Sequence, residues 1–189
     1  MIALVLGGAR SGKSEVAERL AEGLPQPVTY VATAVLDVAH VPGPEDDARH
    51  DLAARVAAHR ARRPQTWRTV ELARGADLAD TTRQLTGTVL VDSLGMWVAG
   101  RAGLVADGER LCRELTARPG DTVVVSDEVG LGVHPSTGAG IAFRDALGEL
   151  NRKLSAVADD VVLVVAGRVL RLDGIEGAAA GTARNAGGG

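Results

Sequence analysis

The chain has 189 residues, with 21 Lys and Arg against 24 Asp and Glu, so its formal net charge is −3 at pH 7. This balance argues against non-specific nucleic-acid binding, which needs a cationic surplus. Apolar residues at 46% and charged residues at 24% are typical of a folded globular protein and argue against intrinsic disorder. No apolar run approaches the ~20 residues that cross a bilayer. The short apolar N-terminus lacks the pattern of a secretory signal, so a cytoplasmic protein without a membrane span is expected.

Short apolar runs alternate with amphipathic patterns along the chain. The runs at 2–6, 28–33, 88–92, 122–126 and 161–166 are typical of buried strands, and the segments 14–24 and 141–158 each carry one apolar helical stripe. This alternation predicts an α/β fold, in which helices cover both faces of a mostly parallel sheet. The run 168–172 follows Gly167 closely enough to form an edge hairpin.

The chain is predicted to be one domain over 1–173. Residues 37–51 contain Pro42-Gly43-Pro44 and an acidic run, which favour an exposed loop. Residues 174–189 are mostly Gly and Ala and are expected to form a flexible tail, because they cannot bury enough apolar surface to offset their ordering entropy. The single cysteine, Cys112, cannot form an intramolecular disulfide and is expected to be a buried small side chain.

The strongest motif follows the first predicted strand and precedes a predicted helix, as a nucleotide-binding P-loop does. It matches G-x-x-x-x-G-K-[ST], and its backbone N–H groups together with the following helix N-terminus are suited to phosphate. Lys13 is expected to bind the β and γ phosphates, and the Ser14 hydroxyl to reach Mg²⁺. The motif predicts a site for a nucleoside triphosphate formed by Gly7, Gly8, Ala9, Arg10, Ser11, Gly12, Lys13 and Ser14.

Acidic residues end two further predicted strands, where a metal-binding carboxylate is expected. Asp92 ends the run 88–92 and is the candidate that would hold Mg²⁺ together with Ser14. Asp127 and Glu128 end the run 122–126, and for them a metal role, a substrate contact and a loop contact all remain open.

A basic helix is predicted over 52–64, with His59 among arginines. One interpretation is a solvated basic face with an incidental histidine; the other is a local anion site for the triphosphate. An imidazole nitrogen is a good nucleophile near neutral pH, so His59 could displace pyrophosphate from an α-phosphate and hold the nucleotide as a phosphoramidate. The other three histidines, His40, His50 and His134, are interpreted as structural or surface residues.

These motifs together resemble the cobinamide kinase/cobinamide-phosphate guanylyltransferase family of cobalamin biosynthesis, over residues 1–172. The resemblance rests on the P-loop, on Tyr30-Val31-Ala32-Thr33-Ala34, and on His59 followed by Arg63-Pro64. Further matching pieces are Trp67-Arg68-Thr69-Val70-Glu71, Glu128-Val129-Gly130-Leu131-Gly132-Val133-His134-Pro135, Phe143-Arg144-Asp145 and Leu150-Asn151. Members commonly have two adjacent histidines where this chain has Ala58-His59, and Asn where Asp127 stands.

The resemblance implies a RecA-like P-loop fold, a homotrimer and a bifunctional enzyme. Such an enzyme phosphorylates adenosylcobinamide with ATP or GTP, then transfers GMP from GTP through a guanylylated His59 onto the phosphate. The products are adenosyl-GDP-cobinamide and pyrophosphate. The catalytic residues carried over are His59 and Lys13, and the GTP contacts beyond the P-loop are Ala32, Thr33, Ala34, Arg60, Ala61, Arg62, Arg63, Glu71 and Asp92.

Two alternatives stay open at the level of the residues. A P-loop small-molecule kinase without guanylyltransferase activity explains the P-loop and Asp92 but not the basic segment around His59. A non-enzymatic RecA-like assembly module explains the nucleotide site alone. In the bifunctional case one P-loop serves two reactions, so either the segment with His59 moves or the nucleotide binds in more than one pose.

Overall fold

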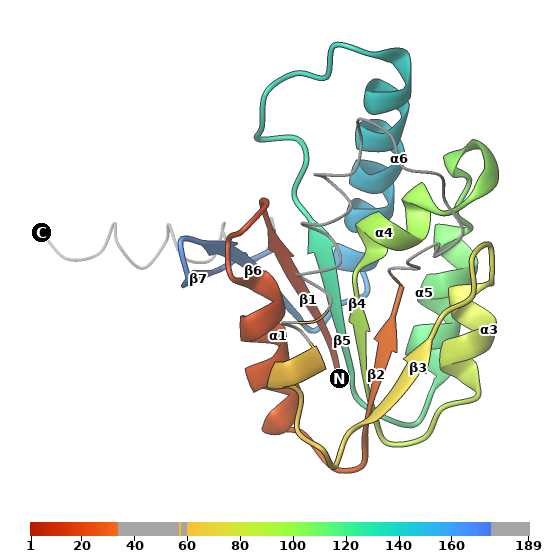
Figure 1. The fold of residues 1–189 in the computed structure, drawn as a ribbon, viewed down its shortest axis with the longest axis vertical. Coiled ribbons are helices and arrows are strands. Elements are labelled where there is room, and N and C mark those ends of the chain that lie inside the picture. Colours follow the sequence, from red (N-terminus) through yellow and green to blue (C-terminus); the bar gives the residue numbers. More distant parts are fainter. Residues whose placement is uncertain (34–56, 58–59, 175–189) are drawn as a thin grey trace, which may run out of the picture.

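The computed structural model describes residues 1–33, 57 and 60–174. Its centre is a seven-stranded sheet with the order β3-β2-β4-β5-β1-β6-β7, parallel except for the antiparallel pair β6–β7 (Figure 1). The strands are β1 (Ile2–Gly7), β2 (Val28–Ala32), β3 (Arg68–Glu71), β4 (Thr88–Asp92), β5 (Thr122–Asp127), β6 (Asp160–Val165) and β7 (Arg168–Arg171). The helices are α1 (Lys13–Glu22), α3 (Leu78–Arg83), α4 (Leu94–Ala99), the 3₁₀ turn η1 (Ala102–Leu104), α5 (Gly108–Ala117) and α6 (Gly138–Ser155).

The two faces of the sheet carry two separate apolar cores, because successive side chains of a strand point to opposite faces. In β1, Ala3 and Val5 pack with Ala17 and Ala21 of α1 on one face. Alternate residues such as Leu4 pack on the other face against α4, α5 and α6. We refer to these as the α1 face and the α6 face. The fold is therefore the predicted α/β arrangement, with helices on both faces.

β5 lies between β1, which leads into the P-loop, and β4, which ends in Asp92. This inserted strand gives the RecA-like order that the resemblance implied. Because the strands are parallel, their carboxyl ends meet at one edge of the sheet, which is the upper end in Figure 1. The loop that follows β1 and the carboxylates that end β4 and β5 are thereby brought to the same edge.

The long apolar strands and the first helix agree with the predicted ranges to within a residue or two, and β7 forms the predicted edge hairpin. The last helix is shifted, since Thr137 caps it by accepting a hydrogen bond from the N–H of Gly140, and it ends at Ser155 rather than 158. Leu20, which belongs to the apolar stripe of the segment 14–24, is 41% exposed. The loop predicted over 37–51 lies outside the described residues, and so does the tail predicted over 174–189, apart from Gly174.

Candidate active site

The P-loop curls between β1 and α1 and brings Lys13 back over its own backbone. Two residues adopt left-handed backbone conformations, Arg10 with φ 57° and Gly12 with φ 91°. Gly7 permits a tight approach: a Cβ there would meet Ser11 Oγ and lie 2.9 Å from the carbonyl oxygen of Val164. The N–H of Gly167, in the β6–β7 turn, donates to the Ser11 carbonyl at 2.8 Å. The conformation of the P-loop is therefore stabilised by a hydrogen bond from the β6–β7 turn as well as by its own glycines.

Lys13 is paired with a carboxylate from the neighbouring strand. Its Nζ lies 2.9 Å from Asp127 Oδ1 and donates to the Gly8 carbonyl at 3.2 Å. The Lys13 side chain is 9% exposed and that of Asp127 is 31% exposed, so the pair is only partly screened by water. Asp127 also packs against the start of α4, where a Cβ on Gly95 would collide with its Oδ2. Of the roles left open for Asp127, the structure shows this contact with the P-loop lysine.

Asp92 lies at the same edge, two strands away from β1 on the α1 face. Its Oδ2 accepts a hydrogen bond from the Tyr30 hydroxyl at 2.8 Å. Burial of the phenol raises the pKa of Tyr30, and the adjacent charge of Asp92 raises it further. Tyr30 therefore stays a neutral donor at physiological pH and orients the carboxylate.

The donor set fits magnesium rather than a softer metal. Ser14, in the first turn of α1, offers a hydroxyl, and Asp92 offers a carboxylate, both hard oxygen ligands. Within residues 1–33, 57 and 60–174 there is no cluster of three His, Cys, Asp or Glu that could cage an ion. Mg²⁺ bound with a nucleotide needs no such cage, because phosphates and water complete its coordination.

Three arginines that follow His59 each contact a different element; we call residues 60–63 the arginine segment. Arg60 forms an ion pair with Glu71 of β3, and Arg62 Nε lies 3.3 Å from Glu18 Oε2 of α1. The guanidinium carbon of Arg63 lies 3.4 Å from the centre of the Tyr30 ring in β2. The arginine segment therefore docks on the α1 face, next to α1 in Figure 1, and reaches β2 through Arg63. His59 and Ala34 lie outside the described residues.

The remaining predicted contacts follow β2. Ala32 and Thr33 stand at the end of that strand, where the Thr33 N–H donates to the Asp92 carbonyl at 3.1 Å. The Thr33 hydroxyl donates to the Ser93 carbonyl at 2.6 Å and accepts from the Ser93 N–H at 2.7 Å. These bonds lock the end of β2 to the end of β4 and so fix where Asp92 emerges from the sheet.

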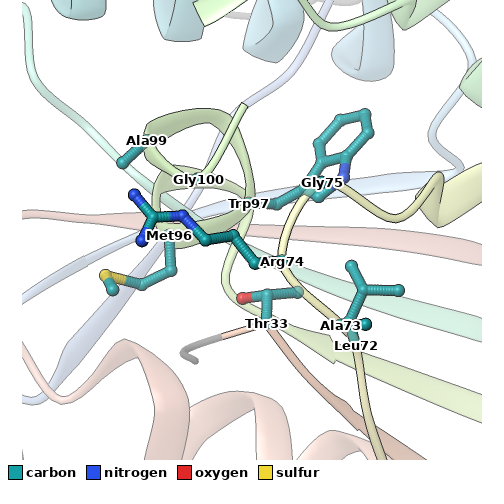
Figure 2. Close-up of a pocket in the computed structure, with 9 residues that line it drawn as sticks. All are labelled: Thr33, Leu72, Ala73, Arg74, Gly75, Met96, Trp97, Ala99 and Gly100. Atoms are coloured by element: carbon teal, nitrogen blue, oxygen red, sulfur yellow. The ribbon is translucent and has the colours of Figure 1, made fainter. Parts of the chain in front are cut away.

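A pocket of about 180 Å³ opens beside Thr33, between the chain after β3 and helix α4. Arg74 extends across it toward Met96 and Ala99, as Figure 2 shows. The volume is below that of typical sites for whole cofactors, which span roughly 300–1,000 Å³. This pocket is therefore large enough for one arm of a ligand but not for a nucleotide.

The model of the family described as cobinamide kinase / cobinamide phosphate guanyltransferase matches residues 3–172. The chain belongs to this family. It is 37% identical over 180 residues to the bifunctional adenosylcobalamin biosynthesis protein CobP of Pseudomonas aeruginosa, covering 90% of this chain and 96% of that protein. It is 36% identical over 188 residues to the bifunctional adenosylcobalamin biosynthesis protein CobU of Salmonella typhimurium, covering 88% of this chain and 97% of that protein.

The fold is also found in more distant proteins. A solved structure from Pyrococcus horikoshii OT3, described as a structural study of Project ID PH0250, superposes with a TM-score of 0.52 at 8% identity. The match covers 92% of this chain and 86% of that one, and it bears on fold alone. In the part of the chain that is described, no helix has the length and apolarity to traverse a bilayer.

Tyr30 and Glu18 were not singled out as site residues from the sequence. Tyr30 reads as an ordinary strand residue, and Glu18 as an exposed position of an amphipathic helix, although it is only 7% exposed. A signal was available for Tyr30, because it is the single tyrosine of the chain and belongs to the Tyr30-Val31-Ala32-Thr33-Ala34 piece of the resemblance.

Proposed function

We propose that this member of the cobinamide kinase / cobinamide phosphate guanyltransferase family performs both reactions at the carboxyl edge of its sheet. In the first, it phosphorylates the aminopropanol hydroxyl of adenosylcobinamide with ATP or GTP. In the second, it transfers GMP from GTP to the new phosphate, giving adenosyl-GDP-cobinamide and pyrophosphate. The observation that carries the proposal is the family match over residues 3–172, which spans the P-loop, His59 and both acidic strand ends.

Phosphoryl transfer depends on positioning and charge neutralisation more than on covalent chemistry. Lys13 exchanges Asp127 for the β and γ phosphates, and the P-loop N–H groups hold the triphosphate in line with the acceptor hydroxyl. Ser14 and Asp92 would hold Mg²⁺, which neutralises charge on the phosphates when it is bound. The hydroxyl oxygen forms the new bond to the γ-phosphorus, its proton passes to water or a nearby carboxylate, and the nucleoside diphosphate leaves.

Guanylyl transfer is proposed to proceed through His59 in two displacements. An imidazole nitrogen attacks the α-phosphorus of GTP and pyrophosphate leaves, so that GMP is held as a phosphoramidate. A phosphate oxygen of adenosylcobinamide phosphate then attacks the same phosphorus, and the histidine is released. In this proposal Arg60–Arg63 and Glu71 lie near GTP, and their present ion pairs are exchanged for contacts with the nucleotide.

The test is covalent labelling with GTP that carries a radioactive α-phosphate, with Mg²⁺ and without corrinoid. We expect label on the denatured protein that is labile to acid and stable to alkali, and its loss in His59→Ala. His134→Ala is the matched control, since that residue is exposed and its ring Nδ1 lies 2.9 Å from the neighbouring Pro135 carbonyl oxygen. A folded, GTP-binding protein that takes up no label would leave the kinase as the better candidate.

We also propose a homotrimer acting in the cytoplasm, on the basis of the family resemblance. The 180 Å³ pocket beside Thr33 is a candidate for one amide arm of the corrinoid, because it lies at the same edge as the P-loop and its wall carries the polar Arg74.

A further inference from the structure

One buried side chain contacts both the carboxylate proposed to hold the metal and the segment that follows His59. The Tyr30 hydroxyl donates to Asp92 Oδ2 at 2.8 Å, and the guanidinium of Arg63 stacks over the same ring at 3.4 Å. We propose that Tyr30 is a positioning residue that links the Asp92 carboxylate to the arginine segment. Through this link, the same side chain affects both the binding of the metal–nucleotide complex and the rate of guanylylation. The inference rests on the proposed function above.

The hydroxyl of Tyr30 is not explained by core packing. The ring is 2% exposed and packs with apolar residues on the α1 face of the sheet, so a phenylalanine would fill the same space. In the register of β2 and β4, Tyr30 pairs with Leu90 and Ala32 pairs with Asp92. The ring therefore runs along the sheet toward its carboxyl edge, and its hydroxyl reaches Asp92. A buried hydroxyl is costly without a partner, so its placement beside this carboxylate is a specific feature.

The Arg63 guanidinium lies over the face of the Tyr30 ring. Its Nε is buried and has no hydrogen-bond partner among residues 1–33, 57 and 60–174. A guanidinium over an aromatic face is held by the negative potential of the ring and by stacking. Arg63 follows His59 by four residues in the sequence, so a change in the Tyr30 ring acts on the chain close to the proposed nucleophile.

The neighbouring contacts define what moves with Arg63. Arg62 is paired with Glu18 of α1, the helix that begins at Lys13 and Ser14. The arginine segment therefore contacts α1 through Arg62 and Tyr30 through Arg63. A ligand that draws Asp92 away from the Tyr30 hydroxyl therefore shifts the contact between Tyr30 and Arg63. The rate of guanylylation of His59 then depends on what is bound at Asp92.

The first test uses the fact that Tyr30 is the only tyrosine in the chain. Adding Mg²⁺ with an α,β-methylene analogue of GTP, which cannot be attacked at the α-phosphorus, should give a tyrosine band in the near-ultraviolet difference spectrum. The band should be absent in Tyr30→Phe and absent when EDTA replaces Mg²⁺. The Mg²⁺ concentration for half-maximal analogue binding should rise about tenfold in Tyr30→Phe, the lower end of the loss seen for residues behind a metal ligand. An Mg²⁺ requirement that is unchanged in Tyr30→Phe, or the absence of a tyrosine band in the wild type, overturns the proposed role of Tyr30.

The second test is a double-mutant cycle on the initial rate of labelling by α-labelled GTP. Tyr30→Phe and Arg63→Gln should each slow labelling, and the double variant should be at least threefold faster than the product of the two effects predicts. Independent sites multiply to within about twofold, so a purely multiplicative result refutes the link between the two residues. Arg101→Gln is the matched control, because the Arg101 guanidinium lies over another aromatic ring, that of Trp97, at 5.3 Å. The effects of Arg101→Gln and Tyr30→Phe on the labelling rate should simply multiply in the double variant.

The two proposals fail in different ways. If the wild type takes up no His59-dependent label, the guanylyltransferase proposal fails, and the difference spectrum still tests the contact with Asp92. If label forms but the effects of Tyr30→Phe and Arg63→Gln on the labelling rate simply multiply, only the proposed link between Tyr30 and Arg63 fails. Thermal denaturation of each variant shows whether a slow rate comes from loss of the fold.

Discussion

At the scale of single residues, we expect the carboxylate of Asp127, which is paired with Lys13, to compete with a bound nucleotide for this lysine. Lys13 must leave Asp127 to bind phosphate, and an ion pair of this exposure is worth about 0.5–1 kcal/mol. We therefore expect Asp127→Asn to bind GTP roughly two- to fivefold more tightly in the absence of Mg²⁺. Isothermal titration in EDTA measures this directly.

Glu128→Gln is the control for that change. Glu128 is the adjacent carboxylate, but its Oε1 accepts from the N–H of Gly130 at 2.6 Å rather than contacting Lys13. It removes the same formal charge from the same strand end. Weaker binding by Asp127→Asn would contradict the competition and indicate that Asp127 contributes to holding the nucleotide.

The motif was sufficient to predict Lys13, Ser14 and Asp92 as residues at one sheet edge, because a P-loop and an acidic strand end are local patterns. It could not predict which carboxylate Lys13 contacts. That depends on β5 being inserted between β1 and β4, so that Asp127 rather than Asp92 is adjacent to the P-loop. The contact between Tyr30 and Asp92 depends likewise on strand register, which residue spacing does not encode.

At the scale of elements, β5 is fastened to α6 by a buried amide. Asn151 is 7% exposed; its Oδ1 accepts from the Ser126 hydroxyl at 2.6 Å, and its Nδ2 donates to the Asp127 carbonyl at 3.1 Å. Replacing it by alanine leaves a buried hydroxyl and a carbonyl without these partners. We expect Asn151→Ala to lower the free energy of unfolding by about 1–3 kcal/mol, measured by urea denaturation.

Arg152→Ala, at the next position of the same helix, provides the comparison. Its side chain is exposed, so the free energy of unfolding should change by no more than about 0.5 kcal/mol. Equal losses in the two variants would contradict a specific contribution of the buried amide, since alanine is a better helix former than either residue.

Elements were predictable where burial imposes a simple pattern. β1, β2, β4 and β5 are apolar on both faces and were recognised from the sequence. β3 was not, because it is an edge strand whose Arg68 and Glu71 are exposed and charged. α3 and α4 were missed because each has only six residues, too few to show a helical period. α5 was not predicted either, although it is amphipathic and Asp107 caps its start by accepting a hydrogen bond from the N–H of Arg110.

At the scale of the whole molecule, the β6–β7 hairpin leaves an edge with apolar side chains in solvent. Val169 and Leu170 are 52% and 58% exposed. Exposed apolar edges are suited to pairing with another chain, so we expect this edge to take part in the proposed trimer. Light scattering should then give about 58 kDa, three times the 19.4 kDa chain. Leu170→Glu should lower that mass.

The companion variant is Leu131→Glu, in an exposed loop on a different part of the chain, at 79% exposure. It adds the same charge and should leave the mass unchanged. A wild-type mass of about 19.4 kDa, that of a single chain, would refute the proposed trimer. A trimeric mass in Leu170→Glu would show that the interface lies elsewhere.

The three contacts of the arginine segment differ in how dissolved ions act on them. Arg60 and Glu71 are 56% and 66% exposed, so counter-ions weaken their attraction first. Arg62 and Glu18 are more sheltered, at 42% and 9%, and Arg63 is stacked on the Tyr30 ring, which is 2% exposed. As ionic strength rises, the segment therefore loosens from Arg60 toward Arg63. The end that is released first is Arg60, which follows the proposed nucleophile His59 directly in the sequence, while Arg63 keeps its place.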